Sequence, residues 1–208
     1  MLSKIFGFFG SSEFAIPKSY RRIFNPKDLI FVMAFSYQIL DQGAVHFVTF
    51  TVHQWVDVFT RDIYREKITE SLRYCQIHKG LEVFSWVLMT NHCHLILRAK
   101  EENLSDIIRD FKKFTAKSLF SLIKENPLES RREWLSKMLS IENRIWFWEE
   151  GYHGEEIYSR EFFAQKSNYI HLNPVRAGFV EKEEEYLWSS AADFYGIRKG
   201  KLELEVFG

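Results

Sequence analysis

Two histidines separated by one residue are the part of this sequence with the clearest capacity for chemistry. His92 and His94 lie in the run from Met89 to Leu97, whose composition is otherwise typical of a β-strand. Because strand side chains alternate between the two faces, both imidazoles are expected on one face, with Cys93 in the core behind them. Adjacent neutral imidazoles can hold a divalent metal ion. The alternative is a pair of edge histidines that hydrogen-bond to their neighbours.

A tyrosine and an asparagine four residues apart form a second candidate group. Tyr169 and Asn173 lie in the run Tyr169-Ile-His-Leu-Asn-Pro174, which is predicted to end a helix. Residues four apart share one face of a helix. If this helix crosses the histidine face, it brings a phenol and an amide oxygen to the same metal ion. The alternative is a surface tyrosine followed by an asparagine that caps the helix before proline.

The composition predicts one globular domain and excludes an intrinsically disordered chain. The chain has 208 residues, of which 46% are hydrophobic and 17% aromatic. Its 28 basic residues equal its 28 acidic residues, so the overall charge does not indicate a nucleic-acid-binding protein. Two cysteines do not make a disulfide framework, and no apolar run is long enough to span a membrane. We treat residues 1–32 as an extension of uncertain status, and residues 33–208 as the domain.

Hydrophobic patterning predicts the element order β-α-β-β-α-β-α. The expected strands are 45–55, 81–89, 92–99 and 145–148, and the expected helices are 61–78, 103–125 and 159–173. The strand at 81–89 is apolar on both faces and is therefore predicted to be central. Pro174 is expected to end the last helix, because proline disfavours helical geometry in the residue before it. This order predicts an α+β fold, with a ferredoxin-like or RRM-like antiparallel sheet that carries helices on one face and the histidines on the other.

Three segments, in this order, resemble the single-tyrosine HUH transposases, in the branch associated with repetitive extragenic palindromes. They are Val45-His-Phe-Val-Thr-Phe50, Val87-Leu-Met-Thr-Asn-His-Cys-His-Leu95 and Tyr169-Ile-His-Leu-Asn-Pro-Val-Arg-Ala-Gly178. A tail motif, Tyr186-Leu-Trp-Ser-Ser190, is also similar to that branch, which includes the IS200-like transposases. The resemblance covers most of the chain, from Val45 to Gly196, and implies an HUH site on the histidine face.

The resemblance implies metal-dependent cleavage and transfer of single-stranded or hairpin-bearing DNA through a 5′-phosphotyrosine intermediate. Tyr169 would be the nucleophile, and the metal ligands would be His92, His94 and Asn173. The cofactor would be Mg²⁺ or Mn²⁺, and two imidazoles with an amide oxygen suit Mn²⁺ better. Relatives of this type include both monomers and homodimers. An enzyme of this kind is expected in the cytoplasm, at the nucleoid, with no membrane partner.

Basic and aromatic side chains are candidates for DNA contacts. The basic candidates are Arg109, Lys112, Lys113, Lys117 and Arg176. They are either phosphate contacts or solvated surface residues. The aromatic candidates, which either stack on bases or pack in the core, are Trp146, Trp148 and Trp188.

Two other functions stay open at this point. A domesticated hairpin DNA- or RNA-binding protein would keep the fold without turnover, although the retained His92, His94, Tyr169 and Asn173 argue against it. A metal-dependent phosphoesterase that uses water would cleave nucleic acid without forming a protein–DNA adduct.

Overall fold

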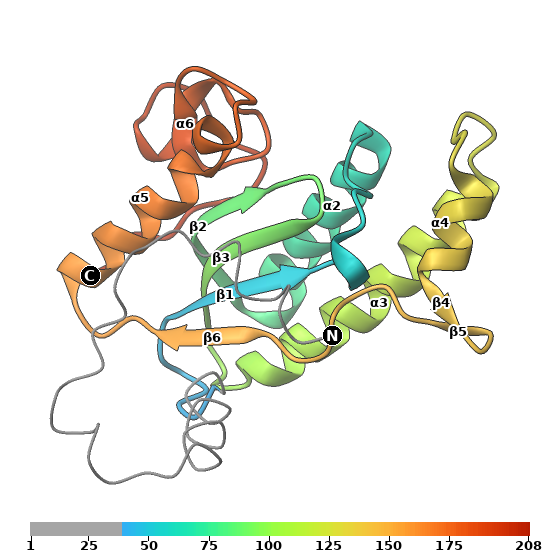
Figure 1. The fold of residues 1–208 in the computed structure, drawn as a ribbon. Coiled ribbons are helices and arrows are strands. Elements are labelled where there is room, and N and C mark those ends of the chain that lie inside the picture. Colours follow the sequence, from blue (N-terminus) through green and yellow to red (C-terminus); the bar gives the residue numbers. More distant parts are fainter. Residues whose placement is uncertain (1–38) are drawn as a thin grey trace, which may run out of the picture. The chain divides into compact units, whose positions relative to one another are not determined.

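The structure is a computed structural model that describes residues 39–208 (Figure 1). Its main sheet contains β1 (His46–Thr51), β2 (Leu81–Leu88), β3 (His92–Ala99) and β6 (His153–Glu156), in the spatial order β2-β3-β1-β6. All three pairings are antiparallel, which confirms the predicted α+β class. The proposed extension, residues 1–32, lies outside the described residues, so the boundary at residue 33 stays a prediction.

The prediction that β2 is a central strand is wrong. In the sheet order β2 has a single strand neighbour, β3, even though all eight of its residues are buried. Its outer edge is covered by the C-terminal segment, because Leu88 N donates to Trp188 O (2.8 Å) and Ser190 N donates to Trp86 O (2.9 Å). β2 is buried because the helices Asp62–Lys79 and Arg160–Arg176 pack against it and the C-terminal segment covers its edge. The apolar pattern of β2 does not distinguish this cover from a second neighbouring strand.

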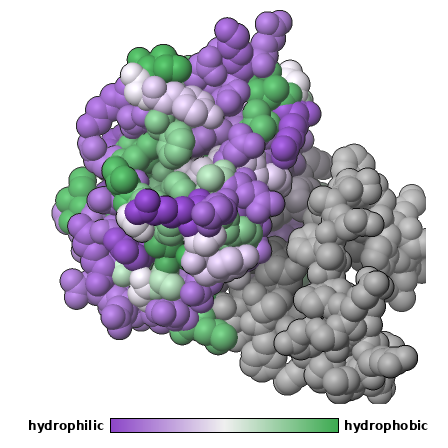
Figure 2. Space-filling model, turned by 90° about the vertical axis from the view of Figure 1, so that its left-hand side faces the viewer, coloured by the Kyte–Doolittle hydropathy of each residue, from purple (hydrophilic) through white to green (hydrophobic). Residues whose placement is uncertain are grey.

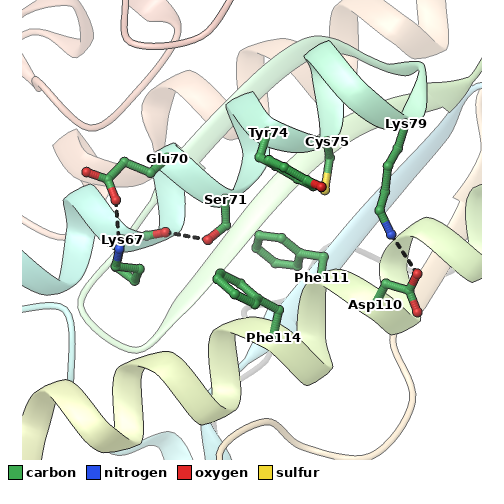
Figure 3. Close-up of a pocket in the computed structure, with 9 residues that line it drawn as sticks. All are labelled: Lys67, Glu70, Ser71, Tyr74, Cys75, Lys79, Asp110, Phe111 and Phe114. Carbon is green, nitrogen blue, oxygen red and sulfur yellow. Dashed lines mark hydrogen bonds and ion pairs between the residues drawn. The ribbon is translucent and has the colours of Figure 1, made fainter.

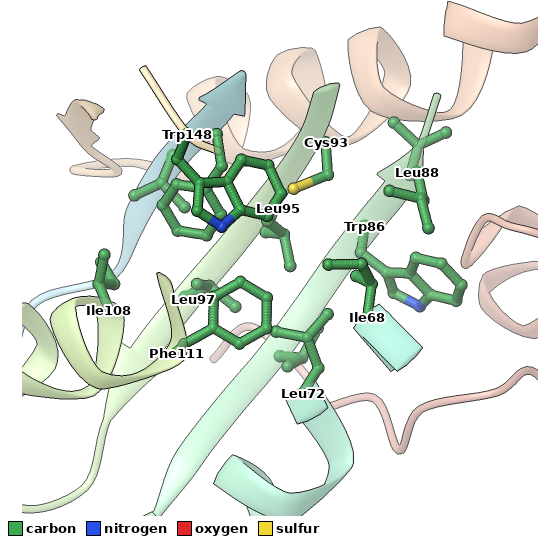
Figure 4. Close-up of a cluster of buried hydrophobic side chains, with 14 of the residues drawn as sticks. Ile68, Leu72, Trp86, Leu88, Cys93, Leu95, Leu97, Ile108, Phe111 and Trp148 are labelled. Atoms are coloured by element: carbon green, nitrogen blue, oxygen red, sulfur yellow. The ribbon is translucent and has the colours of Figure 1, made fainter. Parts of the chain in front are cut away.

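Two long helices cover one face of the sheet. Helix α2 (Asp62–Lys79) ends at Gly80, which adopts a left-handed conformation (φ 66°) as a helix stop. Helix α3 (Leu104–Glu125) packs against α2 and β3. Figure 4 shows how the core residues of these elements meet, among them Ile68, Leu72, Leu95, Leu97, Ile108 and Phe111. The buried face of α3 consists of Leu104, Ile107, Ile108, Phe111, Thr115, Leu119 and Ile123.

The fourth strand of the sheet is not the predicted one. Residues Arg144–Ile145 (β5) instead pair with Ser140–Ile141 (β4) in a separate two-stranded hairpin, which follows the short helix α4 (Arg132–Met138). Trp148 makes only an isolated bridge to Val52. The true fourth strand, β6, has the sequence His-Gly-Glu-Glu and pairs with β1 through its backbone. Its polar composition gives no alternating pattern, so hydrophobic periodicity does not detect it.

Helix α5 (Arg160–Arg176) lies on the opposite face of the sheet from α2 and α3. Ser159 caps it, because its hydroxyl accepts a hydrogen bond from Phe162 N (3.1 Å). Ser167 Oγ and Ser85 Oγ are 2.9 Å apart, which places α5 against β2. The surface on the side of the molecule where α5 lies is mainly hydrophilic, with separate apolar patches (Figure 2).

The predicted end of this helix at Asn173 is wrong, because α5 continues through Pro174 to Arg176. The stop is Gly178 (φ 74°), whose N–H donates to Val175 O (2.9 Å), while Phe179 N donates to Pro174 O (2.9 Å). These two bonds form a Schellman motif, in which a left-handed glycine closes the last turn. Proline near the end of a helix removes only one hydrogen bond, so the glycine determines the boundary here.

The tail motif fastens α5 to β2. After η2 (Glu183–Glu185), Tyr186 Oη donates to Leu88 O (2.9 Å). Ser190, which precedes α6 (Ala191–Phe194), accepts from Trp86 N (2.9 Å) and bonds His171 Nε2 (2.8 Å). His171 is therefore a buried contact between α5 and the tail.

Candidate active site

The two histidines share one face of the sheet, as predicted. His92 and His94 have ring centroids 4.8 Å apart with a 70° angle between planes. In the β1–β3 register Thr51 lies opposite His92 and Thr49 lies opposite His94. Cys93 lies in the core on the other face, where burial raises the pKa of its thiol to about 12. Cys93 therefore acts as a small apolar residue and is no metal ligand.

A hydrogen-bond chain selects the tautomer of His92. Asn91 Nδ2 donates to Trp55 O (3.1 Å) and to Asp57 Oδ1 (3.0 Å), so the amide is oriented with its oxygen toward His92. His92 Nδ1 lies 2.7 Å from Asn91 Oδ1. Because a carbonyl oxygen only accepts, Nδ1 carries the proton and Nε2 keeps a free lone pair. This is the arrangement in which a histidine binds a metal ion through Nε2.

His94 is held by its neighbours in the sheet. Its Nδ1 lies 2.7 Å from Thr49 Oγ1, and Phe47 stacks on its ring with centroids 5.5 Å apart. Burial lowers the pKa of His92 to about 4 and the pKa of His94 well below its usual 6.5, where His92 and Lys166 add to the effect. Both imidazoles are therefore neutral near pH 7, which is the state that a metal ion requires.

Tyr169 is brought to the histidines by α5. Its ring centroid lies 5.2 Å from that of His94 and 6.0 Å from that of Phe47, both at steep angles. Ile170, the next residue along the chain, is fully buried and fixes this part of the helix. The Tyr169 side chain remains 38% exposed, and the Arg176 guanidinium carbon lies 5.6 Å from its ring centre. The phenol is thus open to an incoming substrate and has a cation beside it.

Asn173 lies one turn after Tyr169 and its amide is used within the helix. Its Nδ2 donates to Tyr169 O (2.9 Å), and because α5 continues to Arg176 this bond lies inside the helix and does not cap its end. Within residues 39–208 no group of three or more His, Cys, Asp or Glu side chains is placed to hold a metal ion. The nitrogen donors that fit a metal ion are therefore those of the neutral His92 and His94 rings, and further ligands would be oxygens outside these residue types. Ligation by Asn173 stays a prediction.

The basic residues that were predicted to contact DNA lie on both sides of the sheet. Arg176 lies against Tyr169, whereas the other four lie on α3, behind the sheet. Lys112 Nζ donates to the backbone oxygens of Glu149 and Gly151, and burial lowers the pKa of Lys112 to about 8. Arg109 is paired with Asp106 and Asp110. Lys113 and Lys117 are exposed. DNA contacts by these residues stay predictions.

Two residues at the site were not identified from the sequence. Trp55 is 60% exposed and its ring centroid lies 5.6 Å from that of His92. Lys166 Nζ lies 4.7 Å from the centre of the Phe47 ring and pairs with Glu155. Lys166 precedes Tyr169 by three positions, so helical periodicity offers a signal for it. Trp55 follows the end of β1, where no periodicity applies. Trp148 and Trp188, in contrast, are buried, as the core interpretation predicts.

A separate groove of about 500 Å³ lies between α2 and α3 (Figure 3). Tyr74 and Phe114 line it, and the Lys79–Asp110 ion pair (2.6 Å) lies at one end. It lies on the layer behind the sheet, so it is no part of the histidine site. Within the described part of the chain, no helix is both long enough and apolar enough to cross a membrane.

Comparison with known proteins identifies the family. The family model described as "Transposase IS200 like" matches residues 40–173, more than half of the chain. No curated protein matches the sequence. The fold is similar to that of a REP-associated tyrosine transposase bound to a REP hairpin, at 17% identity over 80% of this chain and 88% of that chain, with a TM-score of 0.54. A putative transposase from Deinococcus radiodurans R1 is 19% identical over 61% of this chain and 87% of that chain, with a TM-score of 0.40. The chain belongs to the IS200-like transposase family.

Proposed function

We propose that this transposase is a metal-dependent, single-stranded DNA endonuclease and strand transferase that uses Tyr169 as its nucleophile. The observation that carries the proposal is the contact of Tyr169 with His94, beside His92, in a member of the IS200-like family. The rings come from two elements, β3 and α5, that lie far apart in the sequence. Core packing alone does not require a half-exposed phenol at this position.

The residues present fit a divalent metal ion. His92 and His94 would hold it through Nε2, with Asn173 Oδ1 as a third ligand, since the bond within the helix uses only the Nδ2 of this amide. Mg²⁺ or Mn²⁺, once bound, supplies positive charge that stabilises the attacked phosphate and the leaving oxygen. The Thr49 and Asn91 side chains keep the two rings oriented for this task.

Tyr169 would attack a phosphorus atom of the DNA backbone. A bond forms between Tyr169 Oη and phosphorus, and the bond from phosphorus to the 3′ oxygen breaks. The phenol loses its proton and the released 3′ oxygen gains one, so the products are a 5′-phosphotyrosine and a free 3′-hydroxyl. Attack by a 3′-hydroxyl reverses the step and joins strands. A phenol has an ordinary pKa near 10, so this step needs a well-positioned phosphate. The position of Arg176 beside the Tyr169 ring supports a role for its guanidinium in holding that phosphate.

The proposed substrate is single-stranded DNA next to a hairpin. One similar solved structure contains a REP hairpin, and here the same class of DNA is part of the proposal. An enzyme of this kind would work at the nucleoid in the cytoplasm, as a monomer or as a homodimer.

The adduct is the direct test. Labelled hairpin DNA with randomised single-stranded flanks is incubated with Mg²⁺ or Mn²⁺ and analysed on denaturing gels. We expect a metal-dependent, protease-sensitive adduct that disappears in Tyr169→Phe, although this variant still binds DNA. His92→Ala and His94→Ala should also lose cleavage, because each removes an imidazole from the pair.

Three results would contradict parts of the proposal. An adduct that persists in Tyr169→Phe would exclude Tyr169 as the nucleophile. Cleavage without an adduct would indicate a phosphoesterase that uses water. Binding without cleavage, across the randomised pool, would indicate an inactive hairpin-binding protein.

A further inference from the structure

Trp55 presents a large aromatic surface to solvent beside the histidine pair. Its side chain is 60% exposed, whereas Trp86, Trp148 and Trp188 are buried. Its ring meets the edge of His92 at 63°, with centroids 5.6 Å apart. The indole thus contributes little to the core, although a side chain of this size can bury a large apolar area.

The backbone that carries this indole is in a conformation that such residues rarely adopt. Gln54 and Trp55 both have positive φ angles, 55° and 57°, in the left-handed region. For a bulky residue this conformation is unfavourable and persists only when surrounding bonds impose it. Residues of this kind cluster at functional sites.

Four hydrogen bonds impose the conformation. His53 N donates to Phe147 O (2.8 Å), and Trp55 N donates to Val52 O (2.9 Å). Gln54 N donates to the carboxylate of Glu149 (2.7 Å), and Asn91 Nδ2 donates to Trp55 O (3.1 Å). Asn91 is also the residue that orients His92, so the loop and the histidine are fixed relative to each other.

The indole continues a row of rings that leads to the nucleophile. Trp55 contacts His92, and His92 contacts His94. His94 in turn contacts Tyr169. A DNA strand whose phosphate lies at Tyr169 and the histidines can therefore reach Trp55 with an adjacent nucleotide.

The charges around Trp55 favour a base over a phosphate. The carboxylates of Asp57 and Glu149 both hold this loop, through Asn91 Nδ2 and Gln54 N respectively. Negative charge at this position disfavours a phosphate group. A neutral nucleobase is not repelled, and stacking on an exposed aromatic ring is the usual way in which proteins bind unpaired bases.

We propose that Trp55 forms a stacking site for an unpaired nucleobase of the DNA strand bound at the histidine pair. The inference rests on the proposed function, because it takes single-stranded DNA as the substrate. It adds to the proposed catalytic residues a residue that binds DNA next to the reaction centre. Stacking is tolerant of sequence, so any base is accepted.

The test compares DNA with and without bases, under conditions in which no cleavage occurs. All proteins carry Tyr169→Phe and EDTA is present, and binding is followed by fluorescence anisotropy. One labelled hairpin has thymidine flanks, and the matched hairpin has abasic flanks of the same length. The parent is compared with Trp55→Ala, with the conservative Trp55→Phe, and with Tyr74→Ala, which removes a similarly exposed aromatic residue (56%) from α2.

We expect Trp55→Ala to weaken binding to thymidine flanks by about 5- to 150-fold, and to leave binding to abasic flanks unchanged. Trp55→Phe should retain most of the affinity, and Tyr74→Ala should match the parent on both probes. Circular dichroism confirms that each variant is folded.

Three outcomes would overturn the inference: a parent that does not prefer thymidine flanks, an unchanged Trp55→Ala, or equal losses on both probes. The adduct assay separates the two proposals. An adduct without a thymidine preference refutes the stacking site alone, and a thymidine preference without an adduct refutes the proposed function alone.

Discussion

At the scale of single residues, Asn91 determines what His92 can do. Its two donor bonds, to Trp55 O and Asp57 Oδ1, leave only its oxygen for the histidine. The free Nε2 of His92 is thus a consequence of three hydrogen bonds around one amide. The type and spacing of His92 and His94 predicted that they share a face of the sheet. They did not predict the hydrogen bonds that orient His92, because a helix and a strand separate Trp55 and Asp57 from Asn91 in the sequence.

Replacing Asn91 with leucine should weaken metal binding without unfolding the protein. The change removes the acceptor that fixes the His92 tautomer, and losses of this kind of support typically lower metal affinity by about 10- to 100-fold. The measurement is a Mn²⁺ titration followed by electron paramagnetic resonance. Asn168→Leu, an exposed position next to Tyr169, is the control and should leave the affinity unchanged. Equal Mn²⁺ affinity in Asn91→Leu and in the parent would show that Asn91 does not support a ligand.

At the scale of elements, the site depends on how α5 is fastened to the sheet. Ser190 Oγ accepts from Trp86 N and bonds His171 Nε2, and it is fully buried. Because α5 carries both His171 and Tyr169, this contact helps to fix the position of the Tyr169 phenol relative to β3. Removing a buried hydroxyl destabilises a protein mainly because its former partners are left buried without a hydrogen bond.

The Ser190→Ala variant should lose stability and activity together. It leaves Trp86 N–H and His171 without a partner, which costs about 1–3 kcal/mol of unfolding free energy. Urea unfolding measures this loss, and the rate of adduct formation should fall because the position of Tyr169 is less restricted. Ser118→Ala, on α3, should change stability by less than about 0.5 kcal/mol. A full-rate Ser190→Ala enzyme would show that this contact does not position Tyr169.

Elements with strong patterns were predictable, and elements defined by bonds from elsewhere were not. The β2–β3 hairpin, α2 and the start of α5 follow from periodicity, Gly80 and Ser159. The strand β6 has no apolar pattern, and its existence depends on the free edge of β1. Likewise Pro174 was a weaker stop than Gly178, because the Schellman bonds form only once the helix has passed the proline.

At the scale of the whole molecule, stability should depend on pH through buried groups. Burial lowers the pKa of His92 to about 4, and burial also lowers the pKa of His171 to about 4. Glu129 is enclosed by Arg131 and Arg61; although burial alone would raise its pKa, their bonds and charges lower it to about 2. Each of these groups therefore binds protons more readily in the unfolded chain than in the folded one.

The free energy of unfolding should therefore fall over two pH ranges as the solution is acidified. A lowered histidine pKa stabilises the fold above pH 6.5, and this stability is lost as pH falls from 6.5 toward 4, at about 1.4 kcal/mol per pH unit for each histidine. The contribution of Glu129 is present above its usual 4.5 and is lost as pH falls toward 2. Urea unfolding at a series of pH values measures the loss over both ranges. In His171→Gln the first slope should decrease by about one proton, and an unchanged slope would contradict the buried neutral state.

The covered edge of β2 also bears on self-association. Strand edges with unpaired backbone groups are the usual places where two copies of a protein join their sheets. In residues 39–208 the C-terminal segment already occupies the edge of β2, so β6 is the strand left to pair. In a sheet joined through β6, a register that sets Glu156 opposite Glu156 of the other copy would be unfavourable, because like charges directly opposite each other repel. Within residues 39–208, a sheet continued from one copy of this transposase to another would therefore have to run through β6, in a register that keeps these carboxylates apart.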